Sequence, residues 1–241
     1  MKVRFRFGIT WMQAALVCAL AVQAQAGLIT NGGFEAGFAG WTTADQIGSE
    51  GGFLLQMGAQ SPVNMLPVPP PPEGTTAAMS DAMGPGSHVL YQDFPVPSFI
   101  PGAFVRFSLF INSGGAPDFF VADHLDFATP ELNQQARVDI MTTSANPFSV
   151  AAGDVLQNLY QTQPGDPLVS GYNTFQTDVS ALLEAHAGET LRLRFAEVDN
   201  VFNFNLGVDD VDVAVIPEPS TWMLMGGALL GVGWMRRRRR G

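Results

Sequence analysis

The feature that most constrains this chain is a period-two alternation of apolar and polar residues in three segments. The apolar positions are Val105, Phe107, Leu109 and Ile111; Leu191, Leu193 and Phe195; and Val211, Val213 and Val215. Alternation of this kind puts all the apolar side chains on one face of a β-strand. Weaker strands are expected over 52–57, 75–80, 89–94, 136–142, 155–161 and 172–179, and one short helix over 180–187, ended by Gly188. The sequence therefore predicts an all-β sandwich.

The first 26 residues have the features of a secretory leader. Lys2, Arg4 and Arg6 precede an apolar stretch over 9–22, and Ala24 and Ala26 form the small-x-small pattern that signal peptidase cleaves. The only cysteine, Cys18, lies inside this leader, and the residues before it fit a lipoprotein signal poorly. We therefore expect a signal peptide over 1–26 and a cysteine-free exported chain.

The C-terminal end has the features of a membrane segment. Residues 221–235 carry no charge, and Arg236, Arg237 and Arg238 begin a run of five arginines that extends to residue 240. Fifteen residues are fewer than the roughly 20 that a membrane core requires, so a crossing helix here would be short. Arginines stay on the cytoplasmic side, which would place the rest of the chain on the periplasmic side of an inner membrane.

Pro217, Glu218 and Pro219 stand directly before this apolar run. A Pro-Glu-Pro motif, a short Gly-rich apolar helix and a terminal arginine cluster, in that order, resemble the PEP-CTERM sorting signal. The resemblance implies a transmembrane sorting helix over 217–241 and exosortase as a partner, which cleaves near Pro217–Pro219. It also implies a Gram-negative host that makes exopolysaccharide. The alternative is a C-terminal anchor that is never cut.

Charge is distributed very unevenly between the ends and the middle. Residues 27–216 hold 21 acidic and 4 basic residues, a formal charge of −17, which disfavours nucleic acid as a partner and favours divalent cations. No break in composition divides this region, and the proline-rich stretch 67–72 is expected to be a loop inside it. We therefore expect one domain over 27–216.

Two short signatures give this domain a second resemblance. The opening Asn31-Gly-Gly-Phe-Glu35 with Gly40-Trp41, and the closing segments 178–195 and 207–211, are similar to galactose-binding-like and carbohydrate-binding jelly rolls. The resemblance implies a jelly-roll β-sandwich with Trp41 in its core. The middle of the domain, including 67–72 and 114–135, departs from the family pattern.

The resemblance also implies a structural calcium ion where the two ends of the domain run side by side. Glu35 matches the acid of the opening turn, and Asp209 or Asp210 matches the acid of the final strand. Asp209 shares parity with Val211 and is expected to point into the sandwich, where a cation would neutralise it. The alternative pairs Asp209 with Arg192 or Arg194 and leaves Glu35 exposed.

No catalytic residues are predicted, and we expect the protein not to be an enzyme. Three histidines and many acids are present, but no signature links them into a nucleophile–base pair or a metal motif. The densest polar cluster, over 123–126, is expected to be a solvated loop.

Sugar binding requires flat aromatic faces near amides or acids. The three tyrosines of the chain, Tyr91, Tyr160 and Tyr172, are the candidates for such a platform. We therefore expect an exported, non-enzymatic protein of the cell surface or the exopolysaccharide matrix of a biofilm that binds extracellular polysaccharide. The alternative is a structural or adhesive matrix protein without a defined sugar pocket.

Overall fold

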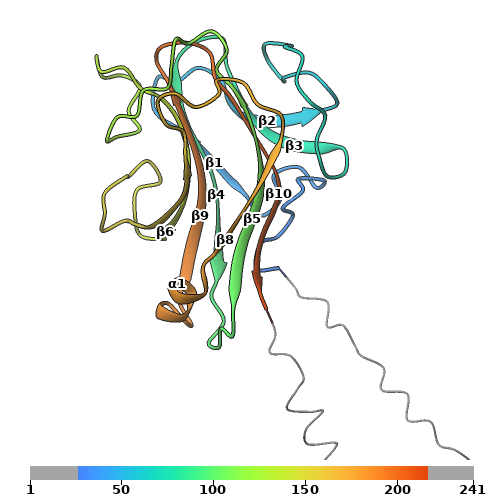
Figure 1. The fold of residues 1–241 in the computed structure, drawn as a ribbon, viewed down its shortest axis with the longest axis vertical. Helices are drawn as coiled ribbons and strands as arrows, with labels where there is room; N and C mark the ends of the chain where they lie inside the picture. The colour runs from blue at the N-terminus through green and yellow to red at the C-terminus, as the bar shows by residue number, and fades with distance from the viewer. Residues whose placement is uncertain (1–26, 217–241) are drawn as a thin grey trace, which may run out of the picture.

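The computed structural model describes residues 27–216, which form two five-stranded antiparallel sheets (Figure 1). One sheet has the order β1-β4-β9-β6-β7, and the other has the order β2-β3-β10-β5-β8. The elements are β1 (Thr42–Asp45), β2 (Gly52–Met57), β3 (Thr76–Asp81), β4 (Gly86–Pro95), β5 (Ala103–Asn112), β6 (Gln134–Thr142), β7 (Val155–Gln161), β8 (Asn173–Asp178), α1 (Ser180–Ala185), β9 (Thr190–Asp199) and β10 (Asn205–Val215). The predicted leader over 1–26 and the sorting tail over 217–241 lie outside the described residues.

The eight strands from β3 to β10 have jelly-roll connectivity. β3 pairs with β10, β4 with β9, β5 with β8 and β6 with β7, and all four pairs are antiparallel. The strand run is therefore wound like one long hairpin, and its successive pairs alternate between the two sheets. This arrangement confirms the predicted all-β jelly-roll sandwich.

All nine strands expected from the sequence are present, and the short helix begins at the expected residue. The helix ends at Ala185, two residues earlier than expected, and His186 is its C-cap; Gly188, with φ of 84°, lies in the left-handed conformation in the turn that follows. The strand that the sequence did not predict is β1, whose four residues Thr-Thr-Ala-Asp carry no apolar alternation. β1 forms because its backbone pairs along the edge of β4, from Thr42 opposite Tyr91 to Asp45 opposite His88.

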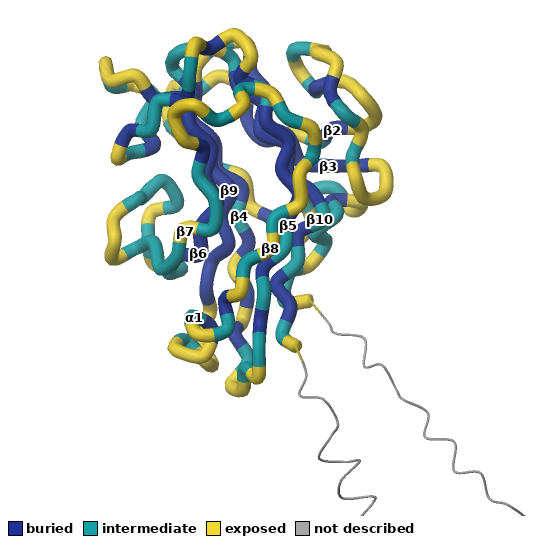
Figure 2. The backbone as a smooth tube through the Cα atoms, in the orientation of Figure 1, coloured by how far each residue is buried: buried dark blue, intermediate teal, exposed yellow. Residues whose placement is uncertain are grey.

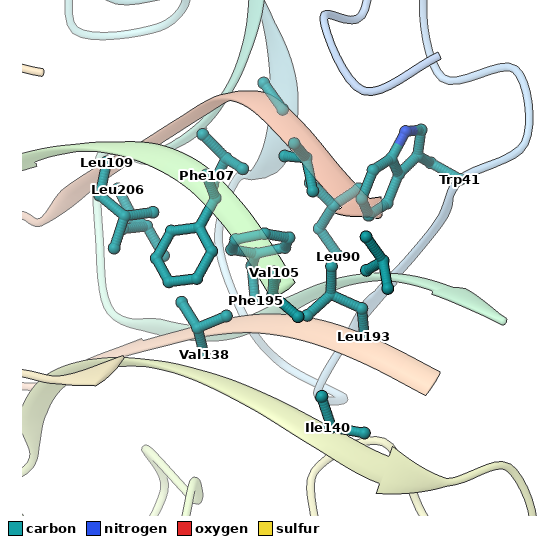
Figure 3. Packing of buried hydrophobic residues seen from close by; sticks show 14 of the residues in the cluster. Trp41, Leu90, Val105, Phe107, Leu109, Val138, Ile140, Leu193, Phe195 and Leu206 are labelled. Carbon is teal, nitrogen blue, oxygen red and sulfur yellow. The ribbon is translucent and has the colours of Figure 1, made fainter. Parts of the chain in front are cut away.

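The core lies between the sheets and is rich in aromatic side chains (Figure 3). Phe107 of β5 meets Phe195 of β9 edge to face, with ring centroids 5.7 Å apart. Trp41 packs on Phe195 and Phe34, and its indole N–H donates to the backbone oxygen of Asn31 at 3.0 Å. Trp41 is only 7% exposed, so the expectation that it belongs to the core is confirmed.

A β-bulge in β10 corrects the expected orientation of Asp209. Two residues of β10, Asp210 and Val211, lie opposite the single residue Phe107 of β5, and Asp210 has φ of 54°. The extra residue shifts the alternation, so that Val208 and Val211 both face the core while Asp209 faces outward. The prediction that Asp209 points into the sandwich was therefore wrong, because it assumed that inward and outward side chains alternate without a break from Asp209 to Val211.

The first described residues run beside the last strand. The amide of Leu28 donates to the oxygen of Val213 at 2.7 Å, and the amide of Val211 donates to the oxygen of Gly32 at 3.1 Å. A side chain at Gly32 would lie 1.8 Å from the oxygen of Val211, so the close approach requires glycine. Within residues 27–216 no helix is long and apolar enough to cross a membrane.

Candidate functional site

The outer face of the β4-β9-β6 layer carries three of the four basic residues of the domain. Val138 and Ile140 of β6 and Leu193 and Phe195 of β9 point into the core, so the alternate residues of both strands point outward. These outward residues are Arg137 and Asp139 of β6 and Arg192 and Arg194 of β9, and we call this surface the arginine face.

Asp139 lies between two of these arginines and is fully buried. It accepts hydrogen bonds from Nε and Nη2 of Arg137, each at 2.8 Å, and a third from Nη2 of Arg194. Burial opposes ionisation, but the hydrogen bonds and charges of Arg137 and Arg194 outweigh it and hold the pKa of Asp139 below its ordinary value. The result is a fixed ionic network with one more cation than anion.

Two loops cover parts of this face, and buried polar groups hold both of them. Nη1 of Arg194 donates to the backbone oxygens of Pro147 and Ser149, both at 2.6 Å. Gln135 donates to the oxygen of Ala122 at 3.0 Å, and Asn133 donates to the oxygen of His124 at 2.9 Å. The loops over 121–124 and 148–151 are therefore positioned by the sheet beneath them.

An open pocket of about 730 Å³ lies between these two loops. Arg137 and Gln161 reach it from β6 and β7, and the loops contribute Asp123, His124 and Phe148. Asp139 accepts from Nε and Nη2 of Arg137, and among the described residues Nη1 of this guanidinium has no hydrogen-bond partner. The pocket thus combines a cationic donor, an amide, a carboxylate and an aromatic ring, which can hydrogen-bond hydroxyls and pack against C–H groups.

The three predicted sugar-binding tyrosines do not share one surface. Tyr91 lies on the arginine face, where the guanidinium carbon of Arg192 sits 4.0 Å from its ring centroid. Tyr160 closes the side of the sandwich against Phe175, with centroids 4.8 Å apart, and burial, with a smaller contribution from Asp166, raises its pKa to about 12. Tyr172 lies on the outside of the opposite sheet, so no common platform forms.

Tyr172 belongs to an apolar cluster that covers the outer face of β3, β10 and β5. It packs with Val68, Met79 and Phe110, and its hydroxyl donates to Oε1 of Gln56 at 2.7 Å. Burial, together with the charge of Asp209, raises the pKa of Tyr172. Val68 comes from the loop over 58–75 that connects β2 to β3, so this loop, with the 67–72 prolines in it, covers the cluster. We call this surface the sealed face.

Two of the predicted calcium ligands, Glu35 and Asp209, both accept hydrogen bonds from one short segment, 73–76. Glu35 accepts hydrogen bonds from the amides of Thr75 and Thr76 and from the hydroxyl of Thr75, at 2.7, 2.8 and 2.9 Å, and these bonds lower its pKa. Asp209 accepts from the amide of Glu73 at 3.0 Å, and burial raises its pKa to about 7. The structure therefore brings Glu35 and Asp209 to the same segment.

The third predicted calcium ligand, Asp210, is engaged elsewhere. Its carboxylate accepts from Nη2 of Arg106 at 2.6 Å. Arg192 pairs with Asp93, and Arg194 with Asp139, so the alternative in which Asp209 pairs with either arginine is wrong. Within residues 27–216 no three His, Cys, Asp or Glu side chains are grouped to hold a metal ion, so calcium here would also need backbone oxygens.

Sequence reasoning missed the pocket, although part of its signal was present. Arg192 and Arg194 alternate with apolar residues in β9, which predicts two outward arginines on one strand. The pairing of β6 with β9, which sets Asp139 opposite Arg194, is a long-range feature with no local signature. The predicted processing residues Ala24, Ala26, Pro217, Glu218, Pro219 and Arg236–Arg238 lie outside the described residues.

Comparison with known proteins identifies the C-terminal tail. Residues 215–239 match the model of the PEP-CTERM protein-sorting motif, so the chain ends in this motif, as the sequence predicted. The motif is that of an exported protein handled by exosortase at the membrane. No curated protein matches the chain.

Several solved structures resemble the chain, and three of them are proteins with different described roles. TmCBM61 in complex with β-1,4-galactotriose has 11% identity and a TM-score of 0.47, and the match covers 79% of this chain and 99% of that one. The K3 adhesin domain of Lys-gingipain from Porphyromonas gingivalis has 14% identity and a TM-score of 0.47, covering 79% and 98%. A Stig cyclase from Fischerella has 15% identity and a TM-score of 0.46, covering 81% and 100%.

Proposed function

We propose that this protein is an exported, non-enzymatic polysaccharide-binding protein of the cell surface or extracellular matrix. The observation that carries the proposal is the open pocket on the arginine face, lined by Arg137, Gln161, Asp123 and Phe148. Sugars present pairs of hydroxyls and a C–H face, and these side chains offer donors, acceptors and an aromatic ring to match them. An open pocket also admits an internal segment of a long chain.

The pocket is held rigidly, which favours binding. Its walls are fixed by Arg194, Gln135 and Asn133, all of which are fully buried. A ligand that enters a preorganised site does not have to order these loops, and the entropic cost of binding is lower.

The sorting motif supports a location at the cell surface of a Gram-negative bacterium. We propose that exosortase cuts near Pro217–Pro219 and that the mature protein loses the arginine run over 236–240. Intact-mass spectrometry of protein from its own host tests this step. A mature form that ends near residue 219 is expected, and an extracellular form that retains Arg240 would contradict it.

Binding is tested with purified residues 27–216 on a glycan array and on the exopolysaccharide of the host. Asp123→Ala and Gln161→Ala remove pocket side chains and are expected to weaken binding about tenfold each, which corresponds to roughly 1.4 kcal/mol. The matched control is Gln176→Ala, an exposed glutamine on β8 of the other sheet. Equal binding by all three variants would contradict the proposed pocket.

The alternative function is a structural or adhesive matrix protein that acts through its charge. The charge of −17 over residues 27–216 favours this alternative, because it would bind divalent cations diffusely. The array separates the two, since a charge-driven matrix protein would select no glycan and would lose retention at high salt.

We also propose a structural calcium ion between Glu35 and Asp209. Support comes from their shared contact with segment 73–76 and from the raised pKa of Asp209, whose buried charge lacks a cationic partner among the described residues. A bound cation would neutralise this carboxylate and stabilise the fold by mass action.

A further inference from the structure

The end of the sandwich from which the chain continues toward the tail also carries an exposed aromatic residue. The β4–β5 loop, over 96–102, lies at this end together with α1 and the last residues of β10 (Figure 1). Phe99, in this loop, is 65% exposed, and Ile216, just after β10, is 48% exposed. No charged residue occurs between Asp93 and Arg106, so the loop is an uncharged segment in a strongly acidic domain.

This loop is fixed to the sandwich on both sides. The amide of Val96 donates to the oxygen of Glu189 at 2.8 Å, and the amide of Gly188 donates to the oxygen of Val96 at 3.1 Å. On the other side, the amide of Ile216 donates to the oxygen of Gly102 at 2.7 Å. A Cβ placed on Gly102 would lie 3.6 Å from Cδ1 of Ile216, so the side chain of Ile216 lies next to this end of the loop. Phe99 therefore projects from a firmly held loop.

The sequence leaves almost no spacer between this end and the apolar tail. Ile216 is still hydrogen-bonded to the β4–β5 loop, and the uncharged run begins at Thr221. Five residues span at most about 17 Å when fully extended. While the tail is in a membrane, this end of the sandwich must therefore lie within about 17 Å of the lipid surface.

We infer that the β4–β5 loop docks on the lipid surface before the tail is cut, with Phe99 and Ile216 inserted among the headgroups. The inference rests on the proposed membrane handling of the tail. A tether of this length keeps the loop at a local concentration on the order of millimolar or more, so a small apolar contact is sufficient. An exposed aromatic ring and an exposed aliphatic side chain at the same end of the domain suit the headgroup–acyl boundary.

Charge at this end selects the kind of lipid. Asp178, Glu184 and Glu189 lie on or beside α1, and Arg106 is engaged with Asp210. The surrounding acids would be repelled by anionic lipids, so the surface that fits is a zwitterionic one such as phosphatidylcholine or phosphatidylethanolamine.

The test uses the chain without its leader, residues 27–241, in phosphatidylcholine vesicles that carry a lipid-attached quencher. This chain has no cysteine, so a thiol-reactive fluorophore can be placed at Ser98→Cys, beside Phe99, or at Asn203→Cys, in the β9–β10 loop at the opposite end. We expect at least twofold stronger quenching at position 98 than at position 203. Phe99→Ser should abolish the difference, whereas Phe202→Ser, which alters the exposed ring of the opposite end, should not.

The outcomes separate the inference from its premise. A chain that does not stay with the vesicles overturns the membrane premise and the docking with it. A chain that stays, but whose quenching at position 98 is unaffected by Phe99→Ser, overturns docking alone. Docking is also overturned if Phe99→Ser slows cleavage of the tail in cells but leaves the quenching at position 98 unchanged. The loop would then contact the processing enzyme instead of the lipid.

Discussion

The two outer faces of the sandwich differ in what covers them. On the arginine face, Arg194 holds its covering loop from below by hydrogen bonds to backbone oxygens, and a pocket remains beside it. On the sealed face, Val68 of the β2–β3 loop packs directly on Met79, Phe110 and Tyr172. Figure 2 shows the buried strands and the exposed loops around them. A loop held by polar anchors leaves room for a ligand, whereas a loop held by apolar contact fills the space.

The largest expected effect is on the arginine face. Asp139→Asn removes the anion between Arg137 and Arg194 and leaves two buried guanidinium groups without compensation. The free energy of unfolding should fall by about 3–5 kcal/mol. Urea denaturation measures it, and a loss below about 1 kcal/mol would show that the network does not hold this face.

On the sealed face, Tyr172→Phe keeps the ring and removes the hydrogen bond to Gln56. Because Gln56 is fully buried, its oxygen loses a partner, and the expected loss is about 1–2 kcal/mol. Glycan binding should be unchanged, because this face is closed. Weakened glycan retention without a loss of stability would instead make Tyr172 a ligand contact.

Asp209, at the edge of the sealed face, should make the stability of the fold depend on pH. Burial raises the pKa of Asp209 to about 7 in the folded state, above the value near 4 expected for the unfolded chain. The folded state therefore binds this proton more tightly, and stability contributed by Asp209 is lost as pH rises from about 4 to 7. Without calcium, Asp209→Asn should melt several degrees above the wild type at pH 8 and equal it at pH 4.

Calcium should reverse this effect in the wild type. Added calcium is expected to raise Tm at pH 8, and chelator to lower it. Glu35→Gln and Asp209→Asn should abolish the calcium-dependent rise, and Asp212→Asn should keep it. Burial also raises the pKa values of Glu197 and Asp199, so these acids add their own pH dependence to Tm. The quantity to compare is therefore the difference in Tm between variant and wild type. Melting curves indifferent to calcium and chelator would refute the site.

The smallest effect is expected at the rim of the arginine face. Asp93→Asn removes the partner of Arg192, but Asp93 is 38% exposed and water can replace it. We expect a loss of less than about 1 kcal/mol in the same urea assay. A loss equal to that of Asp139→Asn would mean that burial does not distinguish the two pairs.

Local alternation predicted most of this fold. The bounds of β2 and β7 match the expected segments, and β5 and β9 extend them, because period-two patterns identify strands that have one buried face. The sequence did not reveal β1, which forms by pairing alone, or the bulge that turns Asp209 outward. The pocket was also missed, since it depends on where the long 113–133 and 143–154 connections cross the sheet.

The same limit applies to the site residues. Glu35 and Asp209 were placed together by a family resemblance that spans both ends of the domain, and the structure brings both to segment 73–76. The three tyrosines were grouped by residue type alone, and the fold places them in three different clusters. Residue type predicts what a side chain can bind, but only the topology decides which side chains meet.

Hydrogen exchange of residues 27–216, with and without the exopolysaccharide of the host, tests the central claim most directly. If the pocket on the arginine face holds the polysaccharide, amides over 121–124 and 148–151 should gain protection, while those over 58–75 on the sealed face should not change. Protection confined to 58–75, or none in either region at saturating polysaccharide, would contradict the account.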